Sequence, residues 1–226
     1  PIKSSAASDV YKRQITNMIR SYIHRCQKDG VKIVMNCEVT PELIKEEKPD
    51  SVIIATGSKT LILPIEGIDN PAIIHGSDLL DGKRPAGKKV LVVGGGMVGC
   101  ETAAFLGEQE HDVTVIEFRD TVGADVIHEH RVYLMKDFED YGIKEITGAK
   151  VCKFYEDGVE YETADGVRHE TRGYDSVILS MGFRNYNPLE EKIKDLVPET
   201  HVIGDAIRAR RALDATKEAY EVASRL

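Results

Sequence analysis

The fold is decided by residues 89–117, which read KVLVVGGGMVGCETAAFLGEQEHDVTVIE. A β-branched apolar run comes first, three glycines follow it, and a helical pattern then leads into a second apolar run, VTVI. Two buried strands joined by one helix form a β-α-β unit. The crossover helix must pack back on the sheet, which makes the two strands parallel. The stretch therefore predicts an α/β fold with a parallel sheet.

The glycines belong to a G-x-G-x-x-G motif made of Gly94, Gly96 and Gly99, with Met97 and Val98 inside it. Gly94 permits the tight turn, Gly96 lets the backbone approach a pyrophosphate, and Gly99 lets the helix pack closely on the strand. Free N–H groups and the positive end of the helix then hold the phosphates. We therefore predict that these residues bind a dinucleotide. The alternative is a glycine-rich turn that binds nothing.

Glu117 ends the second strand of the unit, close to the spacing of about 20 residues at which an acidic side chain accepts hydrogen bonds from the adenosine ribose. Its negative charge repels a 2′-phosphate. Glu117 therefore predicts NADH rather than NADPH as the ligand, although Arg119 nearby favours NADPH.

Outside this unit, residues 1–14 have no apolar face and resemble a peptide translated from sequencing-adaptor sequence. We interpret them as a tail of non-native origin, with a native flexible tail as the alternative. Helical spacing of apolar residues then predicts a helix from Ile15 to Gly30, followed by a strand at 31–35. Thr40 and Pro41 predict a helix start. The other expected elements are a buried strand at 51–55, a helix over 127–141, an antiparallel meander of pieces at 143–146, 150–155, 159–163 and 168–171, a strand at 177–180, and a final helix over 210–226.

The composition of the 226 residues, 42% hydrophobic and 30% charged, is typical of a globular protein. The net charge of −8 gives no reason to expect nucleic acid or a membrane as a partner, and no apolar run is long enough to span a membrane. The four cysteines contain no C-x-x-C pair, so we expect neither a metal site nor a dithiol centre. Together these features favour a small-molecule partner and a reduced, cytoplasmic setting.

Three further features have simple explanations. His128 and His130 lie on different sides of the predicted helix, so we expect solvent exposure rather than metal binding. Cys100 has no histidine paired with it in the sequence pattern, which favours a small packed residue over a nucleophile. The arginine-rich run at 208–211 is compatible with binding a phosphate or a protein, and a solvated loop face is the favoured interpretation.

Five motifs follow one another along the chain. They are IATGS at 54–58, LPIEGID at 63–69, VLVVGGGMVGCE at 90–101, SMGFR at 180–184 and VIGD at 202–205. Their order resembles that of the flavoprotein reductases with two dinucleotide-binding domains. In detail, residues 15–226 are similar to the C-terminal reductase module of the NADH:flavin oxidoreductases related to old yellow enzyme, the family that includes enoate reductase and 2,4-dienoyl-CoA reductase.

The resemblance implies a nicotinamide-binding Rossmann-like domain inserted into an incomplete FAD-binding Rossmann-like domain. The expected boundaries are a partial FAD-binding domain at 15–84, the NAD(H)-binding domain at 85–172 and the C-terminal part of the FAD-binding domain at 173–226. The chain crosses between the domains near 56–76 and 173–182.

The resemblance also implies which residues contact FAD. These are Ala55, Thr56 and Gly57 at a turn near the flavin, Gly182 at the return crossing, and Gly204 and Asp205 after the last strand of the FAD-binding domain. Asp205 would hydrogen-bond the region between the ribityl chain and the pyrophosphate of FAD. The helix after it would direct its positive end toward the flavin. An ordinary turn or capping aspartate is the alternative for Asp205.

The sequence departs from this family mainly in what it lacks. The first β-α-β unit, whose own glycine loop holds the FAD pyrophosphate, should precede Ile15, and the chain starts without Met. We therefore expect an N-terminally truncated chain. A substrate-reducing barrel with FMN and the cysteines of a 4Fe–4S cluster are expected only in the missing part. Within the chain, Glu110 stands where many members have the glycine that ends the nucleotide-binding helix.

We therefore expect an FAD-dependent oxidoreductase module that transfers a hydride from NADH to FAD. In the full-length protein the electrons would continue through the iron–sulfur cluster and FMN of the missing barrel domain to an enoate or enoyl substrate. Hydride transfer requires stacked rings rather than a side-chain acid or base, so no catalytic residue is assigned. One alternative is a non-redox structural or regulatory module that binds an adenine nucleotide. Another is a disulfide reductase similar to thioredoxin reductase, against which the lack of C-x-x-C argues.

Overall fold

The computed structural model describes the backbone of residues 4–226 and the side chains of residues 14–226. The chain divides into two compact units. Unit 1 combines the chain up to Val52 with Pro188–His201, and unit 2 combines Ile53–Asn187 with Val202–Leu226. Each unit is therefore built from segments that lie far apart in the sequence.

Unit 1 contains helices α1 (Ser4–Lys28), α2 (Pro41–Glu47) and α6 (Glu190–Ile193). Helix α2 begins where the sequence predicts. The Leu43 N–H donates to the Thr40 hydroxyl oxygen at 3.4 Å, and Pro41 occupies the first helical position. Strands β1 (Ser51–Ile54) and β12 (Glu199–Val202) pair in a two-stranded sheet, and the boundary between the units passes through both strands.

Two predictions for the N-terminal region are wrong. Helix α1 begins at Ser4 rather than at Ile15, so the segment interpreted as a tail is helical from Ser4 onward; residues 1–3 lie outside the described residues. The strand predicted at 31–35 is not formed. The side chains of Val31, Ile33 and Val34 are exposed there. A strand needs a neighbour for its N–H and C=O groups, and the described chain supplies none to this segment.

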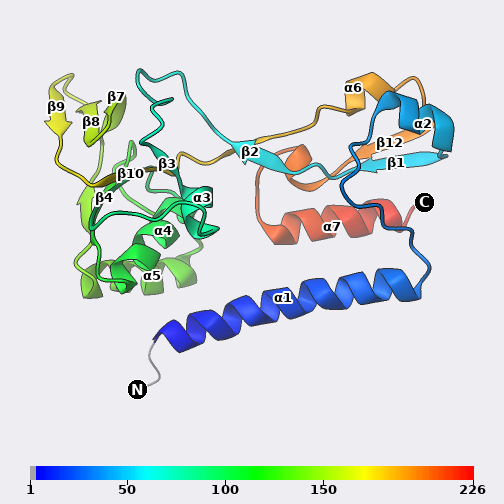
Figure 1. Cartoon of the computed structure of the whole chain (residues 1–226), viewed down its shortest axis with the longest axis horizontal. Coiled ribbons are helices and arrows are strands. Elements are labelled where there is room, and N and C mark those ends of the chain that lie inside the picture. The colour runs from blue at the N-terminus through cyan, green and yellow to red at the C-terminus, as the bar shows by residue number, and fades with distance from the viewer. Residues whose placement is uncertain (1–3) are drawn as a thin grey trace. The chain divides into compact units, whose positions relative to one another are not determined.

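A five-stranded parallel sheet forms the centre of unit 2 (Figure 1). Its strands, in spatial order, are β3 (Ile74–His75), β10 (Ser176–Leu179), β4 (Lys89–Val93), β5 (Asp112–Ile116) and β6 (Lys144–Ile146). Helix α4 (Met97–Glu108) connects β4 to β5, and Val92 pairs with Val115 in their register. The predicted β-α-β unit and the predicted parallel sheet are confirmed.

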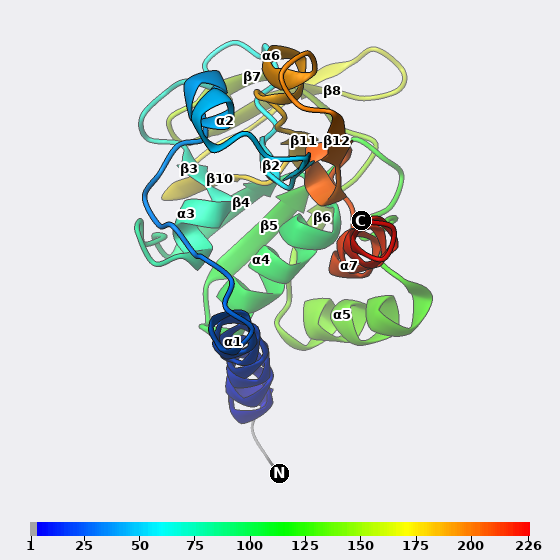
Figure 2. The ribbon, with the colours of Figure 1, turned by 90° about the vertical axis from the view of Figure 1, so that its right-hand side faces the viewer.

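Alternate residues of the central strands face two different layers, because successive strand side chains point to opposite faces of a sheet. Val90 and Val92 belong to a core shared with α4 and with α5 (His128–Asp140). Leu91 and Val93 belong to a second core, shared with the antiparallel sheet of β7 (Lys150–Tyr155), β8 (Gly158–Glu162) and β9 (Arg168–Thr171). Figure 1 shows the helices and the antiparallel sheet on opposite sides of the parallel sheet, and Figure 2 shows α4 lying along β4 and β5.

The predicted helix over 127–141 and the predicted meander over 150–171 are both present, as α5 and as β7 to β9. The piece at 143–146, however, is not part of the meander. It forms β6, which pairs in parallel with β5 because α5 is a second crossover helix between them.

The remaining elements of unit 2 include α3 (Gly76–Leu80), β2 (Ser58–Thr60), β11 (Phe183–Asn185), the 3-10 helix η1 (Gly204–Ala206) and α7 (Ala212–Ala223). Strands β2 and β11 pair antiparallel. The final helix begins at Ala212, two positions after its predicted start. In the described part of the chain, no helix combines the length and the apolar character that crossing a membrane requires.

Glu110, in the turn after α4, has a left-handed backbone conformation with φ of 64°. Its N–H donates to the Gly107 carbonyl oxygen at 2.9 Å, and its own carbonyl oxygen accepts a hydrogen bond from the Lys88 ammonium group. This conformation costs a residue with a Cβ roughly 1–2 kcal/mol. The position therefore has the geometry in which a glycine was expected from the family pattern.

Replacing Glu110 by glycine should raise the free energy of unfolding by about 0.5–1 kcal/mol, because the relief of strain exceeds the added entropy of the unfolded chain. The matched variant Glu139→Gly, at an exposed position of α5, should instead lower it by about 1 kcal/mol. Urea unfolding followed by circular dichroism measures both. Equal destabilisation by the two variants would contradict the strain at Glu110.

Candidate functional site

The glycine loop joins β4 to α4 so tightly that two of its glycines lie directly against backbone carbonyl groups of other residues. Gly94 has φ of +106°, and a Cβ there would lie 2.4 Å from the Ser180 carbonyl oxygen. A Cβ on Gly99 would lie 1.8 Å from the Gly94 carbonyl oxygen. No side chain fits at such distances. This is the geometry that a tight turn at Gly94 and close helix packing at Gly99 require.

The first turn of α4 is arranged differently, because it is open toward solvent on one side. Gly96 precedes the helix and has no side chain to cap it. The Met97 N–H donates instead to Asp125 Oδ1 at 2.9 Å, and the other carboxylate oxygen lies 3.3 Å from the position that a Cβ on Gly96 would take. The start of α4 therefore already binds a negatively charged group, as expected for free N–H groups at a helix N-terminus.

Glu117 connects the loop to the end of β5. Its Oε2 accepts a hydrogen bond from the Gly95 N–H at 2.6 Å, and its Oε1 accepts one from the Arg119 N–H at 2.9 Å. A Cβ on Gly95 would lie 2.9 Å from the Glu117 Cβ and equally close to a methyl of Val122. Gly95 is not among the predicted site residues. The signal that could have identified it is the unbroken run of three glycines.

A cleft of about 1180 Å³ within unit 2 opens over the loop. Small-molecule sites typically have volumes of about 300–1,000 Å³, so the cleft is large enough for a cofactor. The predicted site residues that line it are Gly94, Gly96, Met97, Val98, Glu117, Gly182 and Asp205. Those outside its lining are Ala55, Thr56, Gly57, Gly99 and Gly204. The structure thus brings the predicted dinucleotide loop and part of the predicted flavin site to one cleft.

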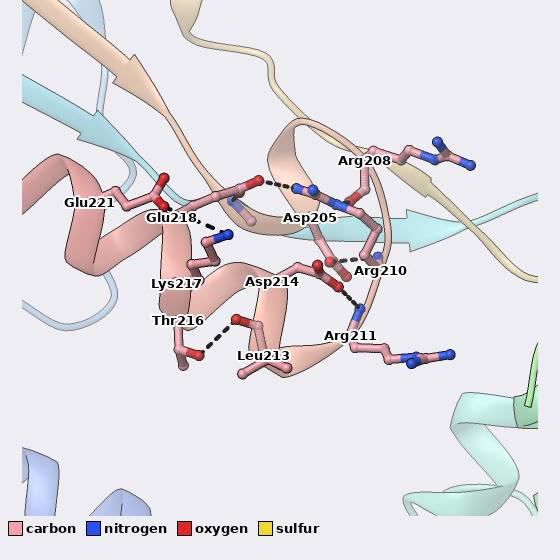
Figure 3. A network of polar contacts seen from close by, with 11 residues as sticks. Asp205, Arg208, Arg210, Arg211, Leu213, Asp214, Thr216, Lys217, Glu218 and Glu221 are labelled. Carbon is pink, nitrogen blue, oxygen red and sulfur yellow. Dashed lines mark hydrogen bonds and ion pairs between the residues drawn. The ribbon is translucent and has the colours of Figure 1, made fainter. Parts of the chain in front are cut away.

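Asp205 lies in η1 and joins two segments that are distant in the sequence. Its Oδ2 accepts a hydrogen bond from the Ser58 hydroxyl at 3.2 Å. Its Oδ1 accepts one from the Arg210 N–H at 3.0 Å (Figure 3). Ser58 directly follows the turn at 55–57, in which Gly57 has φ of 75°. The turn and the aspartate that the family resemblance assigns to FAD are therefore neighbours. Ser58 also lines the cleft and was not predicted.

Carboxylates hold the backbone of the arginine-rich loop before α7 (Figure 3). Asp214 accepts a hydrogen bond from the Arg211 N–H at 3.2 Å. Glu218 pairs with the Arg210 guanidinium at 2.5 Å and also accepts from the Gly204 N–H at 2.7 Å. The hydrogen bond from Arg210, followed by the one from Gly204, lowers the pKa of Glu218 below its usual value of 4.5.

The arginine side chains of this loop differ in their contacts. Among the residues that the structure describes, we find no partner for the guanidinium groups of Arg208 and Arg211, whereas that of Arg210 is paired with Glu218. All three residues are exposed, as predicted, although the ion pair leaves the Arg210 side chain half-buried, and all three also line the cleft. The loop is therefore part of the candidate site and not simply a solvated surface.

Cys100 is fully buried in the core beneath the glycine loop, with 0% exposure. Its Sγ donates to the Gly95 carbonyl oxygen at 3.2 Å, and burial raises the pKa of its thiol to about 12. The predicted packing role is confirmed. His128 and His130 are exposed, also as predicted, and His130 Nε2 lies 3.9 Å from Glu101 Oε1.

Alkylation tests the state of Cys100. Iodoacetamide at about pH 8 should modify the exposed Cys37 and leave Cys100 intact in the folded chain, because a thiol with a pKa of about 12 has almost no thiolate there. Mass spectrometry of a digest gives the site of modification, and the urea-unfolded chain, in which both react, is the control. Modification of both cysteines at the same rate in the folded chain would show that Cys100 is not buried.

The parallel sheet, the glycine loop at the start of α4 and the acidic residue at the end of β5 together define a Rossmann-type dinucleotide-binding protein. The chain belongs to the pyridine nucleotide-disulphide oxidoreductase family, whose model matches residues 4–200. The sequence contains no C-x-x-C pair, and its four cysteines are free thiols.

Individual relatives agree with this assignment. The chain is 30% identical over 200 residues to cinnamate reductase of Clostridium sporogenes, and the matched region covers 87% of this chain and 30% of that protein. It is 32% identical over 199 residues to NADH oxidase of Thermoanaerobacter brockii, covering 86% of this chain and 30% of that protein. The structure of a 2-naphthoyl-CoA reductase complex aligns over 91% of this chain and 31% of that chain, with a TM-score of 0.82 and 31% identity.

The resemblance to enoate-reductase-like flavoproteins is confirmed by these matches. The chain spans about a third of the length of these relatives.

Proposed function

We propose that the chain is an NADH-dependent flavoprotein oxidoreductase module, which binds NADH at the glycine loop and transfers its hydride to FAD. One observation carries the proposal. The Met97 N–H already binds a carboxylate at the open end of α4, and Glu117 is fixed beside it. Family membership supports the same function.

In this proposal the diphosphate of NADH lies against Gly94, Gly96, Met97 and Val98. Gly99 contributes indirectly, by letting α4 approach β4. Glu117 accepts hydrogen bonds from the adenosine ribose. Two hydrogen bonds from backbone N–H groups hold the Glu117 side chain at the end of β5. Its two carboxylate oxygens still have free lone pairs, which can accept hydrogen bonds from the ribose. The same charge disfavours the 2′-phosphate of NADPH.

The flavin-side residues are proposed to be the turn of Ala55, Thr56 and Gly57, together with Gly182, Gly204 and Asp205. The Asp205 carboxylate, oriented by Ser58 and Arg210, fits a role in accepting hydrogen bonds from ribityl hydroxyl groups. FAD supplies the isoalloxazine ring that accepts the hydride. The fit is partial, because the sequence has one G-x-G-x-x-G motif and FAD requires a second loop for its own pyrophosphate.

The domain arrangement is part of the proposal. The NAD(H)-binding domain at 85–172 would be inserted between two parts of an FAD-binding domain, at 15–84 and 173–226. The antiparallel pair of β2 and β11 supports this arrangement, because β2 lies in the first expected crossing, at 56–76, and β11 directly follows the second, at 173–182. Exposed apolar residues of α1, such as Met18, Ile19 and Tyr22, support an FAD-binding part that is incomplete.

For the whole protein we propose that electrons continue from FAD through a 4Fe–4S cluster to FMN in an N-terminal barrel, where an enoate or enoyl substrate is reduced. The names of two relatives, a cinnamate reductase and a 2-naphthoyl-CoA reductase, support this substrate class. A cytoplasmic location remains a prediction from the cysteine content.

A non-redox module that binds an adenine nucleotide is the second candidate, and the single dinucleotide loop favours it. The chain is mixed with FAD, freed of unbound FAD by gel filtration and given NADH without oxygen. The module should retain the yellow colour and lose it on addition of NADH. Asp205→Ala should reduce FAD retention and leave NADH binding unchanged. A colourless chain that binds NADH would favour the second candidate.

Changing Glu117 to serine should increase tolerance of NADPH, because it removes the repulsion of the 2′-phosphate and leaves Arg119 nearby. From the loss of one charge-assisted contact, we expect the ratio of NADH to NADPH affinity to fall by roughly tenfold or more. Calorimetric titration with both nucleotides measures the ratio. Glu129→Ser, an exposed position of α5, is the control. An unchanged ratio would remove Glu117 from the site.

A further inference from the structure

Asp125 is an acidic side chain that directly contacts the start of α4. It comes from the segment between β5 and α5 and is exposed. One carboxylate oxygen binds the Met97 N–H at 2.9 Å, and the other lies 3.3 Å from the position that a Cβ on Gly96 would occupy. The Asp125 carboxylate therefore lies against the face of Gly96 at which any other residue would carry its side chain.

This is the space that a diphosphate needs. In the proposed function the diphosphate binds the N–H groups at the start of α4, and Asp125 already uses one of them. Two anions cannot share one donor at hydrogen-bond distance without strong repulsion. In the described residues no cation is paired with Asp125 that could offset this repulsion.

The segment that carries Asp125 is anchored on both sides of it. The Gly123 N–H donates to the Gly95 carbonyl oxygen at 2.7 Å, and the Val126 N–H donates to the Gly123 carbonyl oxygen at 3.1 Å. Val122 and Val126 are buried in the core. The backbone is thus fixed, whereas the Asp125 side chain is exposed and can leave the helix end by rotating about its own bonds.

We propose that Asp125 is a resident competitor for the diphosphate site, a conclusion that rests on the proposed function. It caps α4 when no nucleotide is bound and must be displaced when a diphosphate binds. A nucleotide has adenosine contacts at Glu117 that offset this displacement, whereas inorganic phosphate and inorganic diphosphate do not. Asp125 therefore weakens the binding of both, and small free anions, which lack the adenosine contacts, are left with the lower affinity.

A simpler role, in which Asp125 only caps a helix that lacks its own cap, makes a different prediction. The Asp125→Asn variant keeps a side-chain oxygen that accepts from the Met97 N–H and loses the negative charge. If capping were the whole role, this variant would bind NADH as the original chain does. If Asp125 competes through its charge, the variant binds anions more tightly.

Calorimetric titrations of the full chain with NADH and with inorganic diphosphate test the proposal. Asp125→Asn should tighten both by roughly two- to thirty-fold, the range of charge effects at helix ends, and diphosphate should gain at least as much as NADH. Asp125→Ala should also bind more tightly, with a lower melting temperature when no ligand is present. Asp120→Asn, in the same segment but outside the cleft lining, removes an equal charge and should change neither affinity.

An unchanged or weaker affinity of Asp125→Asn for both ligands would overturn the proposal. An equal gain in affinity by Asp120→Asn would also overturn it, because the tighter binding would then follow from the lower net negative charge of the chain and not from the position of Asp125. Failure of the proposed function looks different. In that case NADH binds neither the original chain nor the variant, while tighter diphosphate binding by Asp125→Asn would still support competition at this helix end.

Discussion

The close approach of Gly99 to the Gly94 carbonyl oxygen is the constraint on which the site depends. It brings the first turn of α4 directly onto the end of β4, closer than any side chain would permit. Because of this contact, the free N–H groups of the helix face the end of the sheet, where the residues after β5 also lie. Glu117 then reaches back to the Gly95 N–H, and Asp125 reaches the Met97 N–H. The position of both carboxylates therefore follows from one backbone contact.

The cleft is lined by acidic residues that bind backbone N–H groups. Glu117, Asp125, Asp205 and Asp214 each accept a hydrogen bond from the main chain. Three of these bonds fix loops of the site. The bond from Met97 to Asp125 is the exception, because it occupies a helix end at which a phosphate would bind. The chain thus satisfies these backbone donors with its own carboxylates, and in our proposal a bound nucleotide replaces the one at the start of α4.

Much of the fold could be predicted from local sequence. The run from Lys89 to Glu117 predicts its own structure, since two continuous apolar runs, the glycines and a helical pattern agree on one β-α-β unit. The strand expected at 31–35 failed because pairing depends on a partner that local sequence does not reveal. The placement of β6 in the parallel sheet could have been predicted, because a helix precedes this strand and a helical crossover leads to a parallel neighbouring strand.

The site residues could be predicted from the sequence only where the backbone geometry permits a single residue type. Gly94 and Gly99 show this, since backbone contacts exclude any side chain. Asp125 was not found, because its contact with Met97 joins segments far apart in sequence and an aspartate in a loop gives no distinguishing signal. Ser58 was missed for the same reason, since its bond to Asp205 depends on the pairing of distant segments.

The proposed function depends on the binding of NADH at the start of α4. The most direct measurement is the amide NMR spectrum of the isotope-labelled chain during titration with NADH. We expect saturable shifts of the Gly95, Met97 and Arg119 amides, each of which donates a hydrogen bond to Glu117 or Asp125, and none in the helical amides of α1. Saturable shifts elsewhere with these three amides unmoved, or no shifts at all, would contradict it.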